Sequence, residues 1–461
     1  MTTSIINQSS KSITLQVTIP FSRSMLDSEN TIQDAVNEVG SVATQELLKT
    51  FDTDGHGIQF GSVKMTSKGL LSKTYQTPYG EVAVPRHVYQ PSAGGCTYCP
   101  LEHNARIILT STPRFASQVS HKMAEMAAPT VQRDLAINHN RKIPVSVMQN
   151  LTEVVGTVVQ TKEETWDYHV PDLKEKEITA VTIGLDGTCV LMCDGSYRQA
   201  MVGTVALYDT EGERQHTTYV AAPPEYGKEK FKERLTREIR QVKELYPDAI
   251  RIGIADGAHD NWSFLELHTD EQTLDFYHAT EYLSDVADSL FLCPMEKKRW
   301  LEDRCHKLKH TPGAAAMQLA EMKDFQKKID GGEPIVWTPS EGVETKKKTE
   351  KISALKLGVK KTTRIREEKK RTLESSITYF QNNIEKSRMN YAESIKVKHP
   401  IGSGVTESAC KTIVKQRLGQ SGMLWKDKGA GIILSLRTLV HSTGRWEQFW
   451  QKVNQFGIAM A

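Results

Sequence analysis

Two short runs of alternating residues, each stopping at an Asp-Gly pair, constrain this chain most strongly. They are ITAVTIGLDGT (Ile178 to Thr188) and AIRIGIADGAH (Ala249 to His259). Alternation with β-branched residues predicts β-strands, so we expect Asp186 and Asp256 at the carboxyl ends of two buried strands. If these strands are neighbours, two carboxylates meet at one edge of a sheet, and their repulsion favours a cation between them. Hard oxygen ligands select magnesium or manganese.

Each motif taken alone is also explained by an ordinary turn that ends a strand. The segment between the two motifs argues against this alternative. Gln199 to Asp209 and Arg214 to Ala222 predict an antiparallel hairpin, and Gly227 to Tyr246 has the amphipathic spacing of a surface helix on a sheet. The order strand, strand, strand, helix, strand is that of a ribonuclease-H-like core, whose first and fourth strands are parallel neighbours. In that order Asp186 and Asp256 come together.

The stretch from His399 to Trp425 offers a third carboxylate. A Gly-rich entry precedes a helical run that begins near Val405 and has Glu407 in its first turn, where the helix dipole favours an ionised carboxylate. Lys411 and Lys415 follow at spacings of four and eight, so we expect them on the face of Glu407. Such a face suits a metal ion beside a phosphate backbone. The alternative is an ordinary Glu-Lys helix pair.

Four motifs resemble those of a known family: GLDGT, IADGAHDNW, LDFYHATEYL and GSGVTESACKTIVKQRL. They are similar to motifs of Kra-type insertion-sequence transposases, a group of Asp-Asp-Glu transposases in the Mutator-like set, and the similarity runs from about Tyr75 to Trp450. The resemblance implies that Asp186, Asp256 and Glu407 are the catalytic residues and hold two magnesium or manganese ions. His278, after the expected fifth strand LDFYH, matches a Cys-to-His region that follows the second Asp in Mutator-like relatives, although this chain has no cysteine there, and we expect His278 in a second layer around the metals. A core histidine is the alternative there.

Three expected helices, Arg114 to Met126, Thr130 to His139 and Pro144 to Val159, follow one another with short connections. Short polar side chains at the start of the third helix, with Arg141 and Lys142 just before it, are typical of a helix-turn-helix that contacts bases and phosphates. The alternative is an ordinary three-helix bundle packed on the core. The expected DNA contacts are Lys142, Ser146, Gln149 and Asn150.

No strand pattern appears between Leu283 and Lys398, which predicts an all-helical insertion. Its helical stretches, Trp300 to Ile329 and Leu373 to Ile395, are broken at Thr311 to Gly313 and Gly331 to Pro334. Within it, residues 346–371 contain twelve Lys or Arg against three Glu. This run predicts either contact with the DNA backbone or a solvated linker. The candidate contacts in the run are Lys346, Lys347, Lys348, Lys360 and Lys361, in addition to Lys411 and Lys415.

Cysteine usage and the lack of apolar stretches predict a cytoplasmic, nucleoid-associated protein without a membrane partner. Seven cysteines, an odd number, argue against a disulfide framework. Cys96 and Cys99 form one CxxC, which is half of a zinc site, and His87 and His103 are the nearest imidazoles. With no second CxxC, we interpret the cysteines as a reduced turn pair and do not expect zinc. The net charge of +3 is too small to indicate a partner.

We therefore expect an α/β protein. A ribonuclease-H-like mixed sheet would be split by an all-helical insertion and preceded by a β-hairpin region and a helix-turn-helix-like DNA-binding region. An apolar stripe over residues 22–51, which includes Ile32, Val36 and Leu47, predicts an N-terminal helix that packs internally or against a second protomer. The expected divisions are 1–75, N-terminal; 76–160, hairpin and DNA-binding; 161–290, first part of the core; 291–397, insertion; and 398–461, last core helix and C-terminal helices.

The expected function is that of a DNA transposase. It would cleave element ends and join the 3′-hydroxyls to target DNA by two-metal phosphoryl transfer. Its partners would be the terminal repeats, the target DNA and further copies of the chain, in a homodimer or larger assembly. Two alternatives remain: a ribonuclease-H-like structure-selective nuclease without strand transfer, and a domesticated transposase acting as a DNA-binding protein.

Overall fold

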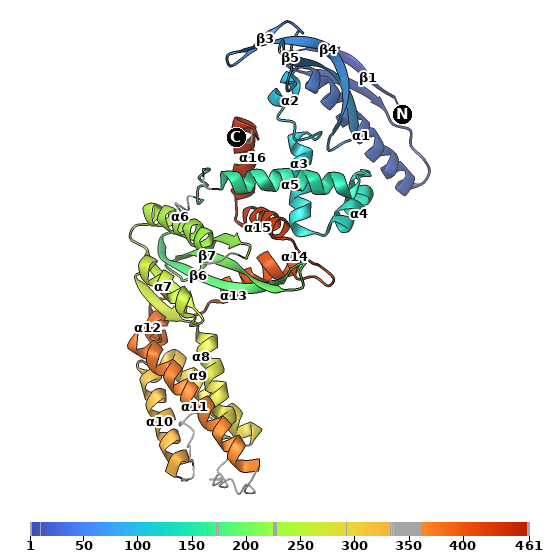
Figure 1. Ribbon diagram of the computed structural model, residues 1–461. Coiled ribbons are helices and arrows are strands. Elements are labelled where there is room, and N and C mark those ends of the chain that lie inside the picture. The colour runs from blue at the N-terminus through green and yellow to red at the C-terminus, as the bar shows by residue number, and fades with distance from the viewer. Residues whose placement is uncertain are drawn as a thin grey trace. The chain divides into compact units, whose positions relative to one another are not determined.

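The chain forms two compact units in the computed structural model (Figure 1). The structure describes residues 2–9, 11–163, 165–171, 173, 175–224, 228–291, 293–331, 333, 335 and 361–458. Unit 1 comprises Met1–His169, Val190–Arg198 and Ile413–Ala461, and unit 2 comprises Val170–Cys189 and Gln199–Thr412. Among the described residues, no helix is both long enough and apolar enough to cross a membrane.

Unit 2 is built on a five-stranded mixed sheet with the strand order β10-β9-β6-β7-β8. Strand β9 pairs in parallel with both β6 and β10, and β7 pairs with β8 as an antiparallel hairpin. The sequence therefore predicted the mixed α/β character and the hairpin correctly. The strands are β6 (Ile178–Leu191), β7 (Tyr197–Asp209), β8 (Arg214–Ala222), β9 (Ile250–Ala255) and β10 (Glu271–Leu274).

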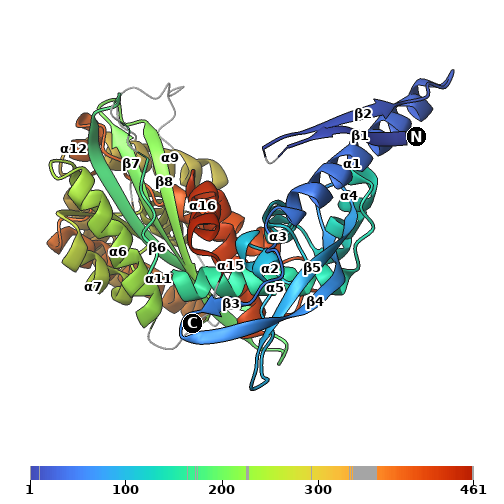
Figure 2. The same cartoon turned by 90° about the horizontal axis from the view of Figure 1, so that it is seen from above.

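Helices cover both faces of this sheet (Figures 1 and 2). On one face lie α6 (Glu229–Leu245) and α7 (His259–His268), whose apolar residues join the main core of the unit. A Cβ atom at Gly203 of β7 would lie 3.0 Å from Leu235 of α6, so glycine lets the helix approach closely. On the other face, a smaller apolar cluster that includes Ala180 and Ile254 contacts Val405 of the short helix α13 (Gly404–Ala409).

Between β10 and α13, the described residues contain helices and no strand, as the sequence predicted. The helices are α8 (Phe276–Leu290), α9 (Pro294–His310), α10 (Ala314–Gly331), α11 (Lys361–Glu385) and α12 (Tyr391–Lys396). The predicted breaks after His310 and Gly331 are confirmed. The prediction of one helix from Leu373 to Ile395 is wrong, because the chain turns at Ser387, which has a left-handed φ of 57°.

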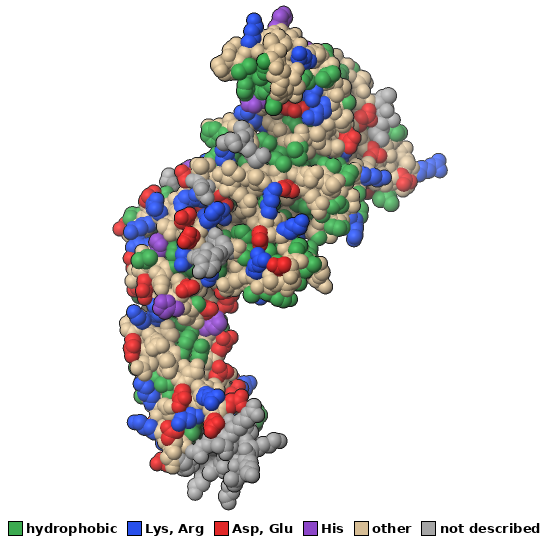
Figure 3. All heavy atoms as spheres, in the orientation of Figure 1, with side chains coloured by type: hydrophobic (Ala, Val, Ile, Leu, Met, Phe, Trp, Pro, Cys, Tyr) green, Lys and Arg blue, Asp and Glu red, His purple; other side chains and the backbone are tan. Residues whose placement is uncertain are grey.

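Aromatic packing holds this helical region together. Trp300 is buried and lies against Phe291 and Phe325, with ring centroids 5.9 Å and 6.5 Å apart. On the face seen in Figure 3, basic and acidic side chains are interspersed over the region. The described part of the insertion therefore shows no surface of a single charge on that face.

Unit 1 contains two antiparallel sheets and a helical cluster. The hairpin of β1 (Thr2–Gln8) and β2 (Ile13–Thr18) is separate from the sheet β3-β4-β5. That sheet comprises β3 (Ile58–Phe60), β4 (Val63–Gln76) and β5 (Glu81–Pro91), so β4 spans the expected division at residue 75. The helices are α1 (Met25–Lys49), α2 (Pro100–Asn104), α3 (Pro113–Glu125), α4 (Ala128–His139), α5 (Val145–Lys162), α14 (Gln416–Leu418), α15 (Asp427–His441) and α16 (Arg445–Phe456).

The N-terminal helix exists as predicted, and its apolar stripe packs internally in part, since Phe51 lies against a buried cluster of the unit. Ile32, Val36 and Leu47 are exposed, at 37%, 52% and 57% of their surface. The buried residues of α1 are Ser28, Ala35 and Leu48, and Leu48 packs against Val82 and Val84 of β5. Packing of the stripe against a second protomer stays a prediction.

Candidate functional site

Two predicted carboxylates lie on adjacent parallel strands. The register pairs Ala180 of β6 with Ile250 of β9, and Gly184 with Ile254. Continued by two residues, this register places Asp186 beside Asp256. Adjacent strands are separated by only about 4.8 Å, so the two chain segments that hold the aspartates are close neighbours.

The two aspartates differ in where their strands end. Asp256 directly follows β9, as predicted. Asp186 lies inside β6, which continues to Leu191, so its predicted place at a strand end is wrong. The strand continues because the alternation of buried and exposed residues does not stop at the Asp-Gly pair. Thr188 and Val190 are buried, and Cys189 between them is exposed.

Alternation along the strands places both aspartates on the sheet face that α13 covers. Successive side chains of a strand point to opposite faces of the sheet, so Asp186 lies on the same face as Gly184. Continued one residue past the end of β9, the same alternation places Asp256 on the face of Ile254. A Cβ atom at Gly184 would lie only 2.1 Å from Oγ1 of Thr406, so this glycine lets α13 lie directly on the strand. The hydroxyl groups of Thr406 and Thr204 are hydrogen-bonded at 2.7 Å.

The same helix positions the third predicted carboxylate. The thiol of Cys410, just after α13, donates to Oδ2 of Asp186 at 3.5 Å. Glu407 precedes this cysteine by three residues, a spacing that places two side chains on neighbouring positions of one helix face. The described part of unit 2 thus brings the segments of Asp186, Asp256 and Glu407 together on one sheet face.

Each carboxylate accepts a hydrogen bond from a group close to it in sequence. The donors are the backbone N–H of Gly187 to Asp186 (2.6 Å), the backbone N–H of Ala258 to Asp256 (3.2 Å) and the hydroxyl of Ser403 to Glu407 (2.6 Å). Within the described residues, no group of three or more His, Cys, Asp or Glu side chains is arranged to hold a metal ion. Like charges repel, which favours separate donors for the three carboxylates.

The chemistry of the donor set nevertheless fits a hard divalent cation. All three predicted ligands are carboxylates, the class that magnesium and manganese prefer. Asp186 and Asp256 are half-buried and Glu407 is exposed, so their oxygens are accessible without unfolding the core.

The structure identifies a residue that the sequence analysis missed. Strand β10 ends at Leu274 and α8 begins at Phe276, so the expectation of a strand through LDFYH is wrong for residues 275–278. His278 lies in the first turn of α8 and its Nδ1 is 3.0 Å from Oε2 of Glu281. Asp275, fully buried, instead caps this helix and contacts the loop before α13. Its signal in the sequence was an Asp at the start of an amphipathic helix.

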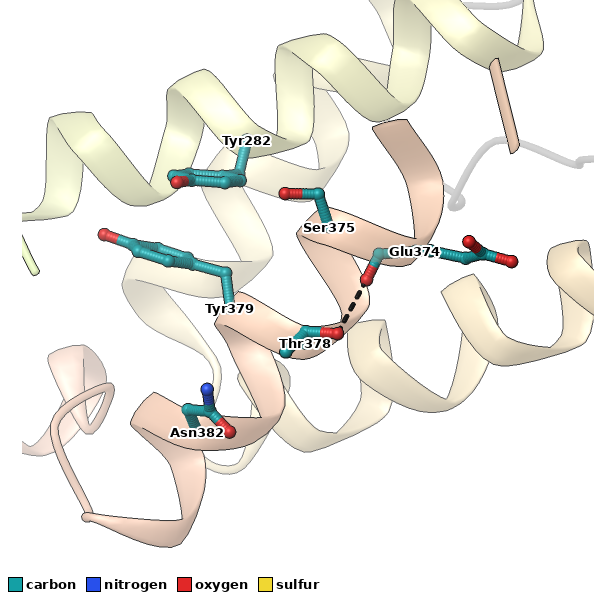
Figure 4. Close-up of a pocket in the computed structure, with 6 residues that line it drawn as sticks. All are labelled: Tyr282, Glu374, Ser375, Thr378, Tyr379 and Asn382. Atoms are coloured by element: carbon teal, nitrogen blue, oxygen red, sulfur yellow. Dashed lines mark hydrogen bonds between the residues drawn. The ribbon is translucent and has the colours of Figure 1, made fainter. Parts of the chain in front are cut away.

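A pocket of about 390 Å³ lies beside the Asp256 segment (Figure 4). The rings of Tyr282 and Tyr379 stack there with centroids 3.7 Å apart, and the Tyr379 hydroxyl donates to the backbone oxygen of Asp256 at 2.8 Å. Burial, followed by the nearby Tyr282 and Asp256, raises the pKa of Tyr379 well above its ordinary value. The phenol therefore stays protonated and remains a donor to the Asp256 segment.

The lysines after Glu407 are exposed, but the helix there is not an ordinary α-helix. Residues Cys410–Lys415 form a π-helix, which has a wider turn. Buried pairs recur every four residues, at 409–410, 413–414 and 417–418, and Lys411 and Lys415 fall between them. The two lysines are thus exposed at the spacing of four and eight residues from Glu407 that the sequence predicted.

The predicted DNA-contacting side chains at the start of α5 are all exposed. They are Lys142, Ser146, Gln149 and Asn150. The opposite face of the helix packs on α3 and α15. Arg141 is not available for phosphates, because it is buried, donates to Gln76 at 2.6 Å and lies over the ring of Phe115.

Most of the predicted basic run lies outside the described residues. Lys346, Lys347, Lys348 and Lys360 lie outside the described residues, and Lys361 begins α11 without a described side chain. In the described part of the run, Lys370 forms an ion pair with Asp330 of α10 at 2.8 Å. That lysine therefore stabilises the helical region.

The CxxC pair lies between β5 and α2. Cys96 is exposed, and Cys99 is the residue before α2. Burial raises the pKa of the Cys99 thiol, which disfavours the thiolate that a zinc ion needs. His87 is 3.0 Å from Asp52 and His103 lies against Tyr98, so both nearby imidazoles contact other side chains.

Three carboxylates on neighbouring segments can bind divalent ions, and a pair of such ions can activate a hydroxyl and stabilise a leaving oxygen. Exposed Lys411, four residues after Glu407, adds a positive charge suited to a phosphate backbone. No protein-family model and no curated protein matches this chain.

Proposed function

We propose that this protein is a DNA transposase that cleaves element ends and joins the 3′-hydroxyls to target DNA by metal-assisted phosphoryl transfer. The observation that carries the proposal is the parallel register of β6 and β9, which places Asp186 beside Asp256 under the helix of Glu407. The resemblance of the surrounding motifs to Kra-type transposases points in the same direction. Metal-dependent cleavage of DNA by the purified chain is the first test.

The strand order supports a ribonuclease-H-like core. The first strand of the sheet, β6, lies between β7 and the fourth strand, β9, and is parallel to β9. Helix α6 connects the hairpin to β9, and a helical region separates β10 from α13. This is the order expected for a ribonuclease-H-like core with an insertion before its last helix.

The proposed roles follow from the position of each residue. Asp186 and Asp256 would hold two divalent ions, and Glu407 would complete the ligands of one of them. The bound ions would supply activation of water or a 3′-hydroxyl and stabilisation of the leaving oxygen. The thiol of Cys410 orients Asp186, and Lys411 offers a cation for the phosphate backbone. No covalent bond between protein and DNA is required.

The choice of metal gives one prediction. With DNA that contains the element ends, we expect cleavage in magnesium or manganese and binding without efficient cleavage in calcium. Calcium accepts more ligands at longer distances, so it should place the attacking oxygen poorly for in-line displacement. Gel analysis of products, beside a binding assay in each metal, measures both effects. Cleavage that continues in excess chelator would contradict a metal-dependent site.

A second prediction concerns α5 as the helix that contacts the terminal repeats. Gln149→Ala should reduce the preference for the repeats over random DNA, because a side chain that contacts bases provides specificity. Lys142→Ala should instead weaken binding to all sequences and lower the slope of log affinity against log salt by about 0.9. Competition binding at several salt concentrations measures both quantities.

Thr161→Ala is the matched control, since Thr161 is exposed near the other end of α5. It should change neither the specificity nor the salt slope. Unchanged specificity in Gln149→Ala, together with an unchanged slope in Lys142→Ala, would favour the alternative of an ordinary helical bundle.

A further inference from the structure

Asp275 connects the segments that hold the second and third predicted carboxylates. Its backbone N–H donates to the carbonyl of Ala255, the residue before Asp256, at 2.9 Å. Its carboxylate accepts one hydrogen bond from the backbone N–H of Ser403, four residues before Glu407. The other oxygen accepts from the N–H of His278 at 2.8 Å. One residue therefore contacts the end of β9 and the start of α13.

Asp275 is buried, so its carboxylate depends on these hydrogen bonds. The residue has 0% of its surface exposed. A buried carboxylate needs donors that match its oxygens, and the positive end of α8 adds a favourable dipole. A neutral or displaced side chain at this position would leave the N–H of Ser403 or His278 unsatisfied in the interior.

Ser403 connects Asp275 to Glu407 through two hydrogen bonds. It stands at the N-cap of α13, where a serine hydroxyl commonly accepts from a first-turn N–H, but this hydroxyl makes no such bond. It donates instead to Oε1 of Glu407 at 2.6 Å. The backbone of Ser403 is thus held by Asp275, and its side chain holds Glu407.

Neighbouring backbone bonds make the connection rigid. The N–H of Phe276 donates to the carbonyl of Ile401 at 3.0 Å, and the N–H of Leu274 donates to the carbonyl of Arg388 at 2.8 Å. The loop before α13 is therefore held by Asp275 and Phe276, directly after β10, while Leu274 holds the turn between α11 and α12. Such support is what fixes a ligand within a fraction of an ångström.

We propose that Asp275 is a positioning residue that sets the place of Glu407 relative to Asp256 through Ser403, and so determines how tightly the three carboxylates hold a divalent cation. The proposal rests on the proposed function of the site. Asp275 itself touches no metal or DNA in this account.

The test uses the full chain, with manganese as the probe. Binding of Mn²⁺ is measured by the electron paramagnetic resonance of the free ion, and amide hydrogen exchange is measured over residues 401–409. For Asp275→Asn we expect an Mn²⁺ dissociation constant raised about tenfold, as for other residues that support metal ligands, with faster exchange at the Ser403 amide. Ser403→Ala should weaken Mn²⁺ binding without disturbing the backbone bond, and Ser403→Thr should restore it.

Asp209→Asn is the matched control. Asp209 is also buried in unit 2 and accepts backbone N–H bonds, from Glu211 and Glu213 at 2.9 Å, but it ends β7 at the turn to β8. It should lower stability comparably and leave Mn²⁺ binding unchanged. Wild-type Mn²⁺ binding in Asp275→Asn, or an equal loss in Asp209→Asn, would overturn the positioning role.

Failure of the proposed function has a different signature. If Asp256→Asn binds Mn²⁺ as tightly as the wild type does, the carboxylates are not metal ligands, and the proposal on Asp275 is overturned with the function on which it rests. If Asp256→Asn binds Mn²⁺ weakly but Asp275→Asn binds it normally, only the role of Asp275 is overturned.

Discussion

Asp186→Asn, Asp256→Asn and Glu407→Gln are each expected to abolish strand cleavage while leaving DNA affinity largely intact. The amide retains the size of the side chain but removes the charge that attracts a hard cation. Loss of electrostatic stabilisation at a catalytic site typically costs on the order of a hundredfold or more in rate. Single-turnover cleavage, measured beside equilibrium DNA binding, separates a chemical defect from a binding defect.

The control for these variants is Asp260→Asn. Asp260 is exposed in the first turn of α7, four residues after Asp256. The Asp260→Asn variant should cleave at the wild-type rate, since Asp260 does not share the sheet face of Asp186 and Asp256. If Glu407→Gln cleaves at the wild-type rate, Glu407 is not part of the catalytic site, even if the two aspartate variants are inactive.

Gly184→Ala is expected to have the second largest effect, because it pushes α13 away from the sheet. The added Cβ would meet Oγ1 of Thr406 at 2.1 Å, and that hydroxyl is fixed by its hydrogen bond to Thr204. Overpacking of this kind typically costs about 1–3 kcal/mol of stability. A displacement of Glu407 by about 1 Å should also lower the cleavage rate on the order of a hundredfold. Thermal unfolding and single-turnover cleavage measure the two effects.

Two variants make this prediction sharper. Gly253→Ala places a Cβ 3.1 Å from Leu265 on the opposite face of the sheet, so it should lower stability and leave the cleavage rate near that of the wild type. Thr406→Ala added to Gly184→Ala removes the clashing hydroxyl and should recover part of the lost rate. A double variant as inactive as Gly184→Ala would mean that the clash is not the cause.

The strands and helices were predictable where the pattern is local. Strand β8 has the bounds that the sequence gives, Arg214 to Ala222, and α6 differs from its expected range by two residues or fewer at each end. Amphipathic spacing and strand alternation are properties of consecutive residues, so they can be recognised without knowing which distant segments pack together. Helix α7 was not predicted, and it begins only three residues after Asp256.

The site was predictable in its residue types but not in its supporting contacts. Asp186 lies inside its strand because the alternation of buried and exposed residues continues past the Asp-Gly pair to Val190, a signal that the turn tendency of Asp-Gly conceals. The π-helix after Cys410 and the contact of Asp275 with Ser403 depend on segments far apart in the chain. The sequence drew attention to His278, whereas the buried residue that contacts both Ala255 and Ser403 is Asp275, three residues before it.

The central claim is that one centre of three carboxylates both cleaves and joins DNA. The most direct measurement incubates the purified chain with Mg²⁺, DNA that spans both flanks of the element, and a target plasmid, and then sequences the junctions. The account predicts element 3′-ends joined to target DNA, with no protein attached, and no junctions with Asp186→Asn. Cleavage without junctions would indicate a nuclease, and DNA that is bound but never cut in magnesium or manganese would contradict the account.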